Sequence, residues 1–126
     1  MDPMSEQVQI PGPGHPITVE PNPRRVVARV GEQVIADTTS ALTLCEADYP
    51  PVQYVPMQDV DQASLRRTDT RTHCPYKGDA SYYSIVTGSG ELTDAVWTYE
   101  QPHAAVATIA GHVAFYPDRV QVSEQA

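Results

Sequence analysis

The sequence has little positive charge and few reactive side chains. Among 126 residues it contains one lysine, seven arginines, two cysteines and one tryptophan. Sixteen acidic residues outnumber the cations, and the net charge is −8. Nucleic-acid binding through phosphates needs a cationic face, so no nucleic-acid partner is predicted. The arginines near positions 24–29 and 66–71 could hold a small anion, but we expect them to pair with the protein's own carboxylates.

The sequence also lacks long hydrophobic runs. None approaches the roughly 20 residues that span a bilayer, so no membrane partner is predicted. Residues 1–14 are polar, without the cationic start and apolar block of a secretory signal. We therefore expect a cytoplasmic protein whose Cys45 and Cys74 are reduced rather than joined. These cysteines stand 29 residues apart without a Cys-x-x-Cys pair, so no metal site or other cofactor is predicted.

Turn-forming residues divide the chain into short segments typical of β-strands. Twelve prolines interrupt it, and no amphipathic helical stretch exceeds two turns. The pattern predicts a mainly β, antiparallel-rich domain over residues 16–122, built as a sandwich or curved sheet pair of about eight strands. A flexible tail is expected over residues 1–15 and another over 123–126. One short helix is expected near residues 59–66, with Asp59 or Asp61 as its cap.

The segment 72–78, Thr-His-Cys-Pro-Tyr-Lys-Gly, is the best candidate for a functional site because it places a thiol beside the only lysine. Its proline holds Cys74 in an extended conformation, while Gly78 permits a positive φ. Cys74 is therefore expected at the end of a strand, before a turn that carries Lys77 back past it. His73 would point to the opposite face of that strand, so a base for the thiol would have to come from elsewhere.

Several segments together carry a resemblance to a known family. They are Asp37-Thr38, Leu44-Cys45-Glu46, Tyr54-Val55-Pro56, Asp59-Val60, 72–82, Ala95-Val96-Trp97-Thr98-Tyr99, Pro102 and 113–116. Over roughly residues 17–122 the chain resembles the DUF427 family. The resemblance implies a small all-β domain, found mostly in bacteria and without an established activity.

A nucleotidyltransferase-type label is attached to that family. Such chemistry uses paired carboxylates that hold magnesium beside phosphates, commonly near a glycine-rich turn. Asp59 with Asp61, and the segment Gly88-Ser89-Gly90, are the only candidates for these roles that we identify. Helix capping and an ordinary hairpin loop explain the two segments equally simply, and we favour those interpretations.

Three functional interpretations follow. The first is a pocket for a small anionic or ring-bearing ligand, with or without catalysis. The second is a protein-interaction or homodimerisation module, in which the same aromatic side chains form an exposed face. The third is a turn that only determines the fold, with the cysteine as inert packing. We favour the first, since such a turn has no use for a solitary lysine beside a thiol. The catalytic candidates are Cys74, Lys77 and Glu46, and the ligand-binding candidates are Tyr54, Tyr76, Trp97, Tyr99 and His103.

Two contacts are expected at this site. A part-buried charge needs an opposite partner, so Glu46 and Lys77 should approach each other across the pocket. Glu46 or His103 could also reach Cys74 if the ends of their strands converge. With Lys77 nearby, Cys74 is expected to be alkylated ahead of Cys45.

Overall fold

The computed structural model describes residues 9–125, and part of the tail expected over residues 1–15 lies outside them. Within the described residues all strand pairs are antiparallel, so the mainly β fold predicted from the sequence is confirmed. The strands are β1 (Ile17–Asn22), β2 (Arg25–Val30), β3 (Gln33–Thr38), β4 (Ala41–Glu46), β5 (Val52–Pro56), β6 (Leu65–Cys74), β7 (Gly78–Thr87), β8 (Gly90–Tyr99), β9 (His112–Phe115) and β10 (Gln121–Gln125).

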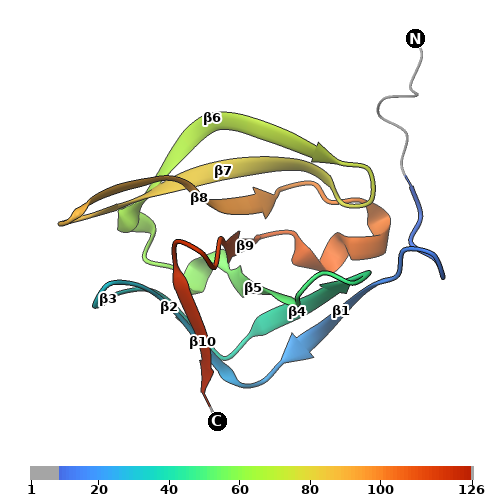
Figure 1. The fold of residues 1–126 in the computed structure, drawn as a ribbon, viewed down its shortest axis with the longest axis horizontal. Coiled ribbons are helices and arrows are strands. Elements are labelled where there is room, and N and C mark those ends of the chain that lie inside the picture. Colours follow the sequence, from blue (N-terminus) through green and yellow to red (C-terminus); the bar gives the residue numbers. More distant parts are fainter. Residues whose placement is uncertain (1–8, 126) are drawn as a thin grey trace.

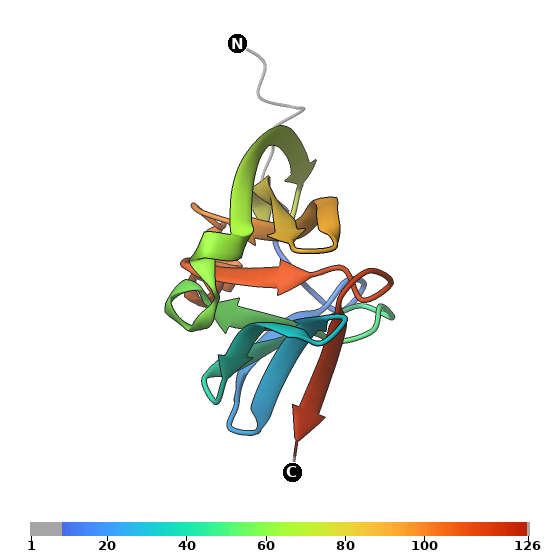
Figure 2. The ribbon, with the colours of Figure 1, turned by 90° about the vertical axis from the view of Figure 1, so that its left-hand side faces the viewer.

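The strands form two sheets. One has seven strands in the order β1-β4-β5-β9-β8-β7-β6, and the other has three in the order β10-β2-β3 (Figure 1). Figure 2 shows β10 running beside β2, so the C-terminal strand forms one edge of the small sheet. The chain stays in this sheet through Gln125, three residues beyond the domain boundary expected at residue 122.

The seven-stranded sheet carries a hydrophobic core on each face. Successive residues of a strand point to opposite faces, so Val55 enters one core and its neighbour Tyr54 enters the other. The first core also contains Val26 and Ile35, which come from the three-stranded sheet. The second is capped by η4 (Ala104–Ile109), a 3-10 segment whose Val106 and Ile109 are buried. Both faces of the large sheet are therefore covered over much of its area.

The large sheet curves so that its two ends face each other. Figure 1 shows β6 and β7 above β1 and β4, with η4 between them on the right. The second core joins these ends, because it contains Leu44 of β4 together with Ala80 and Tyr82 of β7. The turn between β6 and β7 consequently lies opposite the end of β4, although 31 residues separate Glu46 from Lys77 in the chain.

The short helix expected near residues 59–66 is not a continuous helix. Two single 3-10 turns occupy this region, η2 (Met57–Asp59) and η3 (Gln62–Ser64), and Leu65 already begins β6. Asp59 accepts a hydrogen bond from Thr38 Oγ1 at 2.6 Å, which ties the first turn to β3. Leu65 pairs with Ile85 in the long β6–β7 hairpin. Sheet pairing over long sequence separations outweighs the local helix preference here.

Three arginines of the two clusters, Arg25, Arg66 and Arg67, pair with carboxylates of the same chain, which is part of what the sequence led us to expect. Arg25 binds Asp37 at 2.6 Å, and Arg67 binds Glu100 through two hydrogen bonds of 2.7 and 3.0 Å. Solvent screens exposed pairs of this kind, so they add little to stability. Among residues 9–125 no helix is long and apolar enough to cross a bilayer.

Gly78 fixes the turn that presents Lys77. Its φ is +114°, a conformation that side chains with a Cβ rarely adopt. We expect Gly78→Ala to destabilise the protein by about 1–3 kcal/mol, measured by chemical denaturation. Gly88→Ala is the matched control, because its backbone has no such φ and a Cβ there meets no atom within 4 Å. Equal stability of the two variants would contradict a strained turn at Gly78.

Candidate functional site

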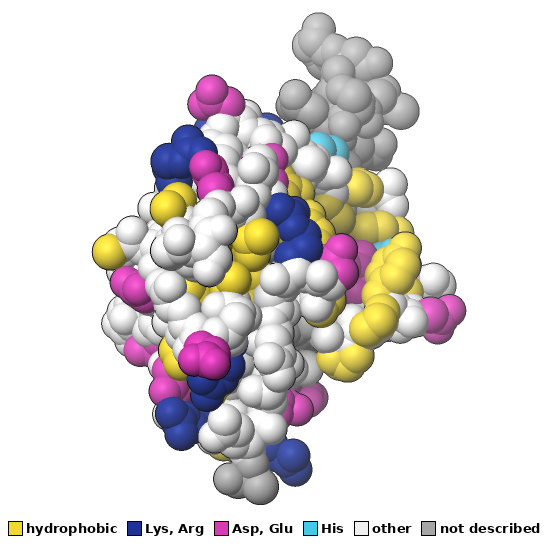
Figure 3. Space-filling model, turned by 60° about the vertical axis from the view of Figure 1, so that its left-hand side comes forward, with side chains coloured by type: hydrophobic (Ala, Val, Ile, Leu, Met, Phe, Trp, Pro, Cys, Tyr) yellow, Lys and Arg dark blue, Asp and Glu magenta, His cyan; other side chains and the backbone are white. Residues whose placement is uncertain are grey.

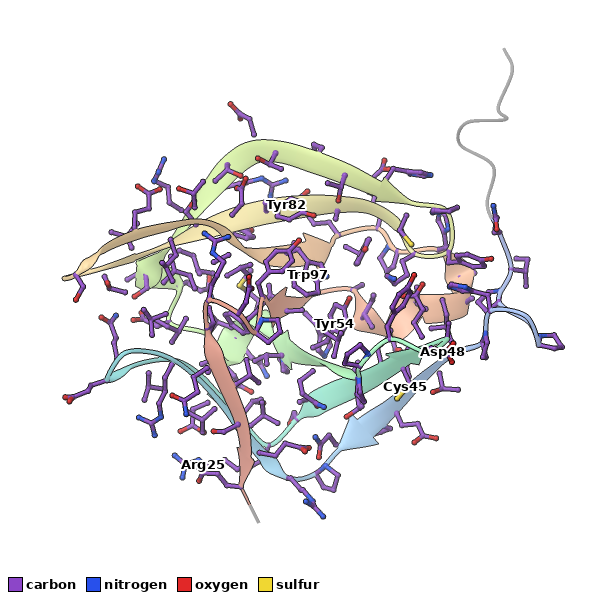
Figure 4. The ribbon with its side chains drawn as sticks, viewed as in Figure 1. Arg25, Cys45, Asp48, Tyr54, Tyr82 and Trp97 are labelled. Carbon is purple, nitrogen blue, oxygen red and sulfur yellow. The ribbon has the colours of Figure 1, made fainter. Side chains whose placement is uncertain are left out.

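An aromatic pocket opens on the concave face of the large sheet, where β4, β5, β7 and β8 converge. Its volume is about 270 Å³, and Glu46 and Lys77 form part of its wall. Hydrophobic side chains gather on the right-hand side of Figure 3, next to acidic and histidine side chains. In Figure 4, Tyr54, Trp97 and Tyr82 lie together near the middle of the molecule, far from Arg25. The aromatic side chains that line the pocket are Tyr49, Tyr54, Tyr82, Trp97, Tyr99 and Tyr116.

The expected contact between Glu46 and Lys77 is confirmed. Lys77 Nζ donates a hydrogen bond to Glu46 Oε1, and their side chains are only 10% and 12% exposed. Burial alone would raise the pKa of Glu46, but the hydrogen bonds from Lys77 and His15, with attraction to both, hold this pKa below its usual value. Glu46 therefore stays ionised at neutral pH. The ammonium also lies 5.8 Å from the centroid of the Tyr99 ring.

His15 joins this site from the segment that the sequence pattern assigned to a flexible tail. Its Nε2 lies 2.7 Å from Glu46 Oε2, the oxygen that Lys77 leaves free. Its ring stacks on Tyr76, with centroids 4.0 Å apart and an interplanar angle of 10°. The backbone amide of Gln9 also donates to the carbonyl of Pro75 at 2.9 Å. Residues 9–15 thus lie against the turn that carries Lys77, and a lone His-Pro in a polar segment gave no signal of this contact.

The remaining polar groups of the pocket are mostly phenols. Trp97 Nε1 donates to the Tyr54 hydroxyl at 3.1 Å, and the Tyr116 hydroxyl donates to that of Tyr82 at 3.4 Å. Burial is the main cause that raises the pKa of Tyr54 and of Tyr99 above the usual value. These tyrosines therefore remain neutral and offer hydroxyl groups rather than phenolates to a ligand.

The structure brings five of the eight predicted site residues into one pocket wall, and the other three do not line the pocket. The five are Glu46, Tyr54, Lys77, Trp97 and Tyr99. Cys74 is half-buried and packs against the second core, while Tyr76 stacks on His15. His103 contacts the turn through its backbone, since its amide donates a hydrogen bond to the Lys77 carbonyl at 3.0 Å. Among residues 9–125 its buried Nδ1 has no hydrogen-bond partner.

Three aromatic wall residues were not among the predicted ones. Tyr82 and Tyr116 belong to the segments that carry the family resemblance, so a signal for them existed. Tyr49 lies between the end of β4 and the pair Pro50-Pro51, a context that predicts only a loop residue. The residue is 63% exposed. Alternation along a strand cannot show which tyrosines of different strands share a cavity.

The segments considered for magnesium and phosphate binding are engaged elsewhere. Asp61 Oδ2 accepts a hydrogen bond from Ser64 Oγ at 2.8 Å, and Asp59 binds Thr38 as described above. The segment 88–90 forms the turn of the β7–β8 hairpin, where the Ser89 amide donates to Thr87 Oγ1. No group of three His, Cys, Asp or Glu side chains that could hold a metal ion occurs within the described part of the chain.

A second, broader depression of about 780 Å³ lies beside His73, Asp79 and His103. His73 Nδ1 lies 2.7 Å from Asp79 Oδ1, so these two side chains bind each other. Glu100 in the same wall is held by Arg67. The aromatic pocket differs from this depression in holding a buried ion pair beside six aromatic side chains, and it is therefore the better candidate site.

Loss of one member of the ion pair should destabilise the protein. We expect Lys77→Met to lower the free energy of unfolding by about 1–3 kcal/mol at pH 7, because Glu46 is left buried without its cation. The double variant Lys77→Met/Glu46→Gln should recover part of this loss. Equal stability of wild type and Lys77→Met at pH 7 would contradict the pair.

The sign of the pH effect follows from Glu46. Its pKa is lowered in the folded state, so its contribution is complete above the unfolded pKa of about 4.3 and is lost as the pH falls through the folded value. The stability difference between wild type and Glu46→Gln should therefore shrink below about pH 4, as followed by urea denaturation. If the stability difference stays the same below about pH 4, the ionised Glu46 carboxylate is not its cause.

The exposure of the two cysteines favours a labelling order opposite to the one expected from the sequence. Cys45 is exposed on β4, whereas Cys74 is partly covered by the second core. Iodoacetamide should therefore modify Cys45 in the folded protein well before Cys74, as read by peptide mass spectrometry. Faster modification of Cys74 would show that its sulfur reaches solvent and would restore it as a candidate nucleophile.

Comparison with known proteins identifies the family of the domain but not its activity. The sequence matches the family model described as a domain of unknown function, DUF427, over residues 18–126. No match to a curated protein was found. The matched region contains nearly all of β1 and every later strand, together with the whole wall of the aromatic pocket, while His15 precedes it. The chain therefore belongs to the DUF427 family.

Proposed function

We propose that the aromatic pocket binds a small ring-bearing molecule. The observation that carries this proposal is the unused hydrogen-bonding capacity of Lys77. An ammonium has three N–H donors, and within residues 9–125 the one partner found for Lys77 Nζ is Glu46. Because Lys77 is 8% exposed and lines the pocket, its remaining donors are available to a molecule that enters there.

Charge favours a ring-bearing ligand over an anionic one. Glu46 already neutralises Lys77, and its lowered pKa keeps the carboxylate charged at neutral pH. An incoming anion would have to displace this carboxylate or lie beside it. Six aromatic side chains, by contrast, offer apolar faces and edges to a planar ring.

The arrangement supports binding more directly than catalysis. Of the three catalytic candidates, Glu46 and Lys77 line the pocket, but Cys74 does not. A thiol outside the wall cannot attack a bound ligand without a rearrangement of the turn. We therefore assign Glu46 and Lys77 to ligand recognition and give Cys74 a packing role.

The alternative, an interaction or homodimerisation module, finds less support. Among residues 9–125 the exposed large hydrophobic side chains are Ile10, Val34, Tyr49 and Val86. They come from separate elements, and large exposed hydrophobic side chains that stand singly are normal on a monomer surface. Tyr49 is the only one of the four that lines the pocket.

The single tryptophan allows a direct test, because Trp97 lines the pocket and its side-chain N–H signal in an NMR spectrum responds to a ring bound there. Trp97 also lines a neighbouring hollow with Phe115 and Val122, so the effect of Tyr49→Ala shows which of the two is occupied. Addition of indole-sized aromatic fragments should shift that signal. Tyr49→Ala should weaken binding about three- to tenfold with little loss of stability, because Tyr49 is exposed yet forms part of the wall. Val86→Ala, an exposed hydrophobic away from the pocket, is the control and should bind as wild type. A Trp97 signal unmoved by every fragment would reject the proposal.

A further inference from the structure

We infer that the ligand of this pocket is a neutral planar heterocycle with a cyclic-amide edge, in which a ring N–H stands beside a ring C=O. This inference rests on the proposed function and names the class of ligand. Its basis is the pairing of one buried donor and one buried acceptor, Lys77 and Glu46, in the same pocket wall.

The ion pair presents both kinds of hydrogen-bonding capacity side by side. Glu46 has two carboxylate oxygens with about four acceptor positions, of which Lys77 and His15 take one each. Lys77 retains donors, as described above. Because the two side chains are in direct contact, their free donor and free acceptor lie next to each other. An amide edge matches this pair, its carbonyl accepting from Lys77 while its N–H donates to Glu46.

The charges of Glu46 and Lys77 disfavour a ligand edge that is itself anionic or cationic. A carboxylate or phosphate would satisfy Lys77 but would place a second negative charge beside Glu46, and the whole chain already carries −8. An amine or amidinium would satisfy Glu46 but would face the ammonium of Lys77. A neutral edge with one donor and one acceptor repels neither group and uses both, since charged partners make the stronger hydrogen bonds.

The walls set the shape of the ligand. Trp97 and Tyr116 have ring centroids 4.5 Å apart, and Tyr54 meets Trp97 edge-on. Trp97 and Tyr116 are half-buried, so parts of both rings face the pocket. A volume of about 270 Å³ is at the small end of ligand pockets and admits one ring or two fused rings.

Four bicyclic probes separate edge recognition from ring binding in the full chain. 2-Quinolone carries the amide edge, N-methyl-2-quinolone lacks its N–H, quinoline-2-carboxylate is anionic, and quinoline has the rings alone. Dissociation constants come from titrations that follow the Trp97 side-chain signal. 2-Quinolone should bind at least about tenfold more tightly than its N-methyl analogue, because methylation leaves Glu46 unpaired against the ligand. It should also bind more tightly than the carboxylate and quinoline.

Glu46→Gln provides the matching change in the protein. The preference for 2-quinolone over its N-methyl analogue should fall severalfold, because a charged acceptor becomes a neutral amide. Glu32→Gln, at an exposed position outside the pocket, should leave the preference unchanged. If Glu46→Gln does not fold, the four probes on the wild-type protein still decide the question.

The outcomes distinguish the two levels of the proposal. Binding of all four bicyclic compounds with similar affinity would overturn the amide edge and leave the aromatic pocket as a site for rings. Tightest binding of quinoline-2-carboxylate would overturn the edge in favour of an anion. Failure of all four to shift the Trp97 signal would reject the inference, and failure of the wider fragment set as well would reject the proposed function with it.

Discussion

The contact between Lys77 and Glu46 is the constraint on which the site depends. Burying two charges costs several kcal/mol of solvation, so the pair can persist only where its geometry and additional hydrogen bonds offset that cost. His15 supplies one such bond, and the Gly78 turn sets the position of the ammonium. Replacing both members of such a pair by apolar residues is often neutral for folding, whereas removing one of them is costly. The pair is therefore better explained by the chemistry it presents to the pocket than by the stability it adds.

The curvature of the large sheet makes this contact possible. A flat sheet of seven strands would keep β4 and the β6–β7 turn far apart, since four strands stand between β4 and β6 in its order. Curvature brings both ends over one concave face, where the second core and η4 fill part of the space. The part that stays unfilled is the aromatic pocket. The fold thus produces its cavity by incomplete closure of one sheet upon itself.

Half of the site could be read from the sequence because its signals are local. The only lysine, the proline that precedes it and Gly78 together predicted a turn that presents an ammonium, and the structure has Lys77 in that turn. The need of a buried charge for a partner selected Glu46. Cys74 stays an untested candidate that does not line the pocket, because adjacency along the chain does not show which side of a strand faces a cavity. His15 was missed, since a polar segment rich in proline and glycine resembles any flexible tail.

The sequence by itself determined the fold class and the chemistry of the turn. These follow from proline and glycine placement and from residue type, which act over a few neighbouring residues. The tertiary structure alone decided the extent of β6 and which tyrosines share a wall with Trp97. It also decided that His15 and Lys77 take different oxygens of one carboxylate. Those features depend on sheet order and curvature, which come from packing between residues distant in the chain, and no local pattern encodes them.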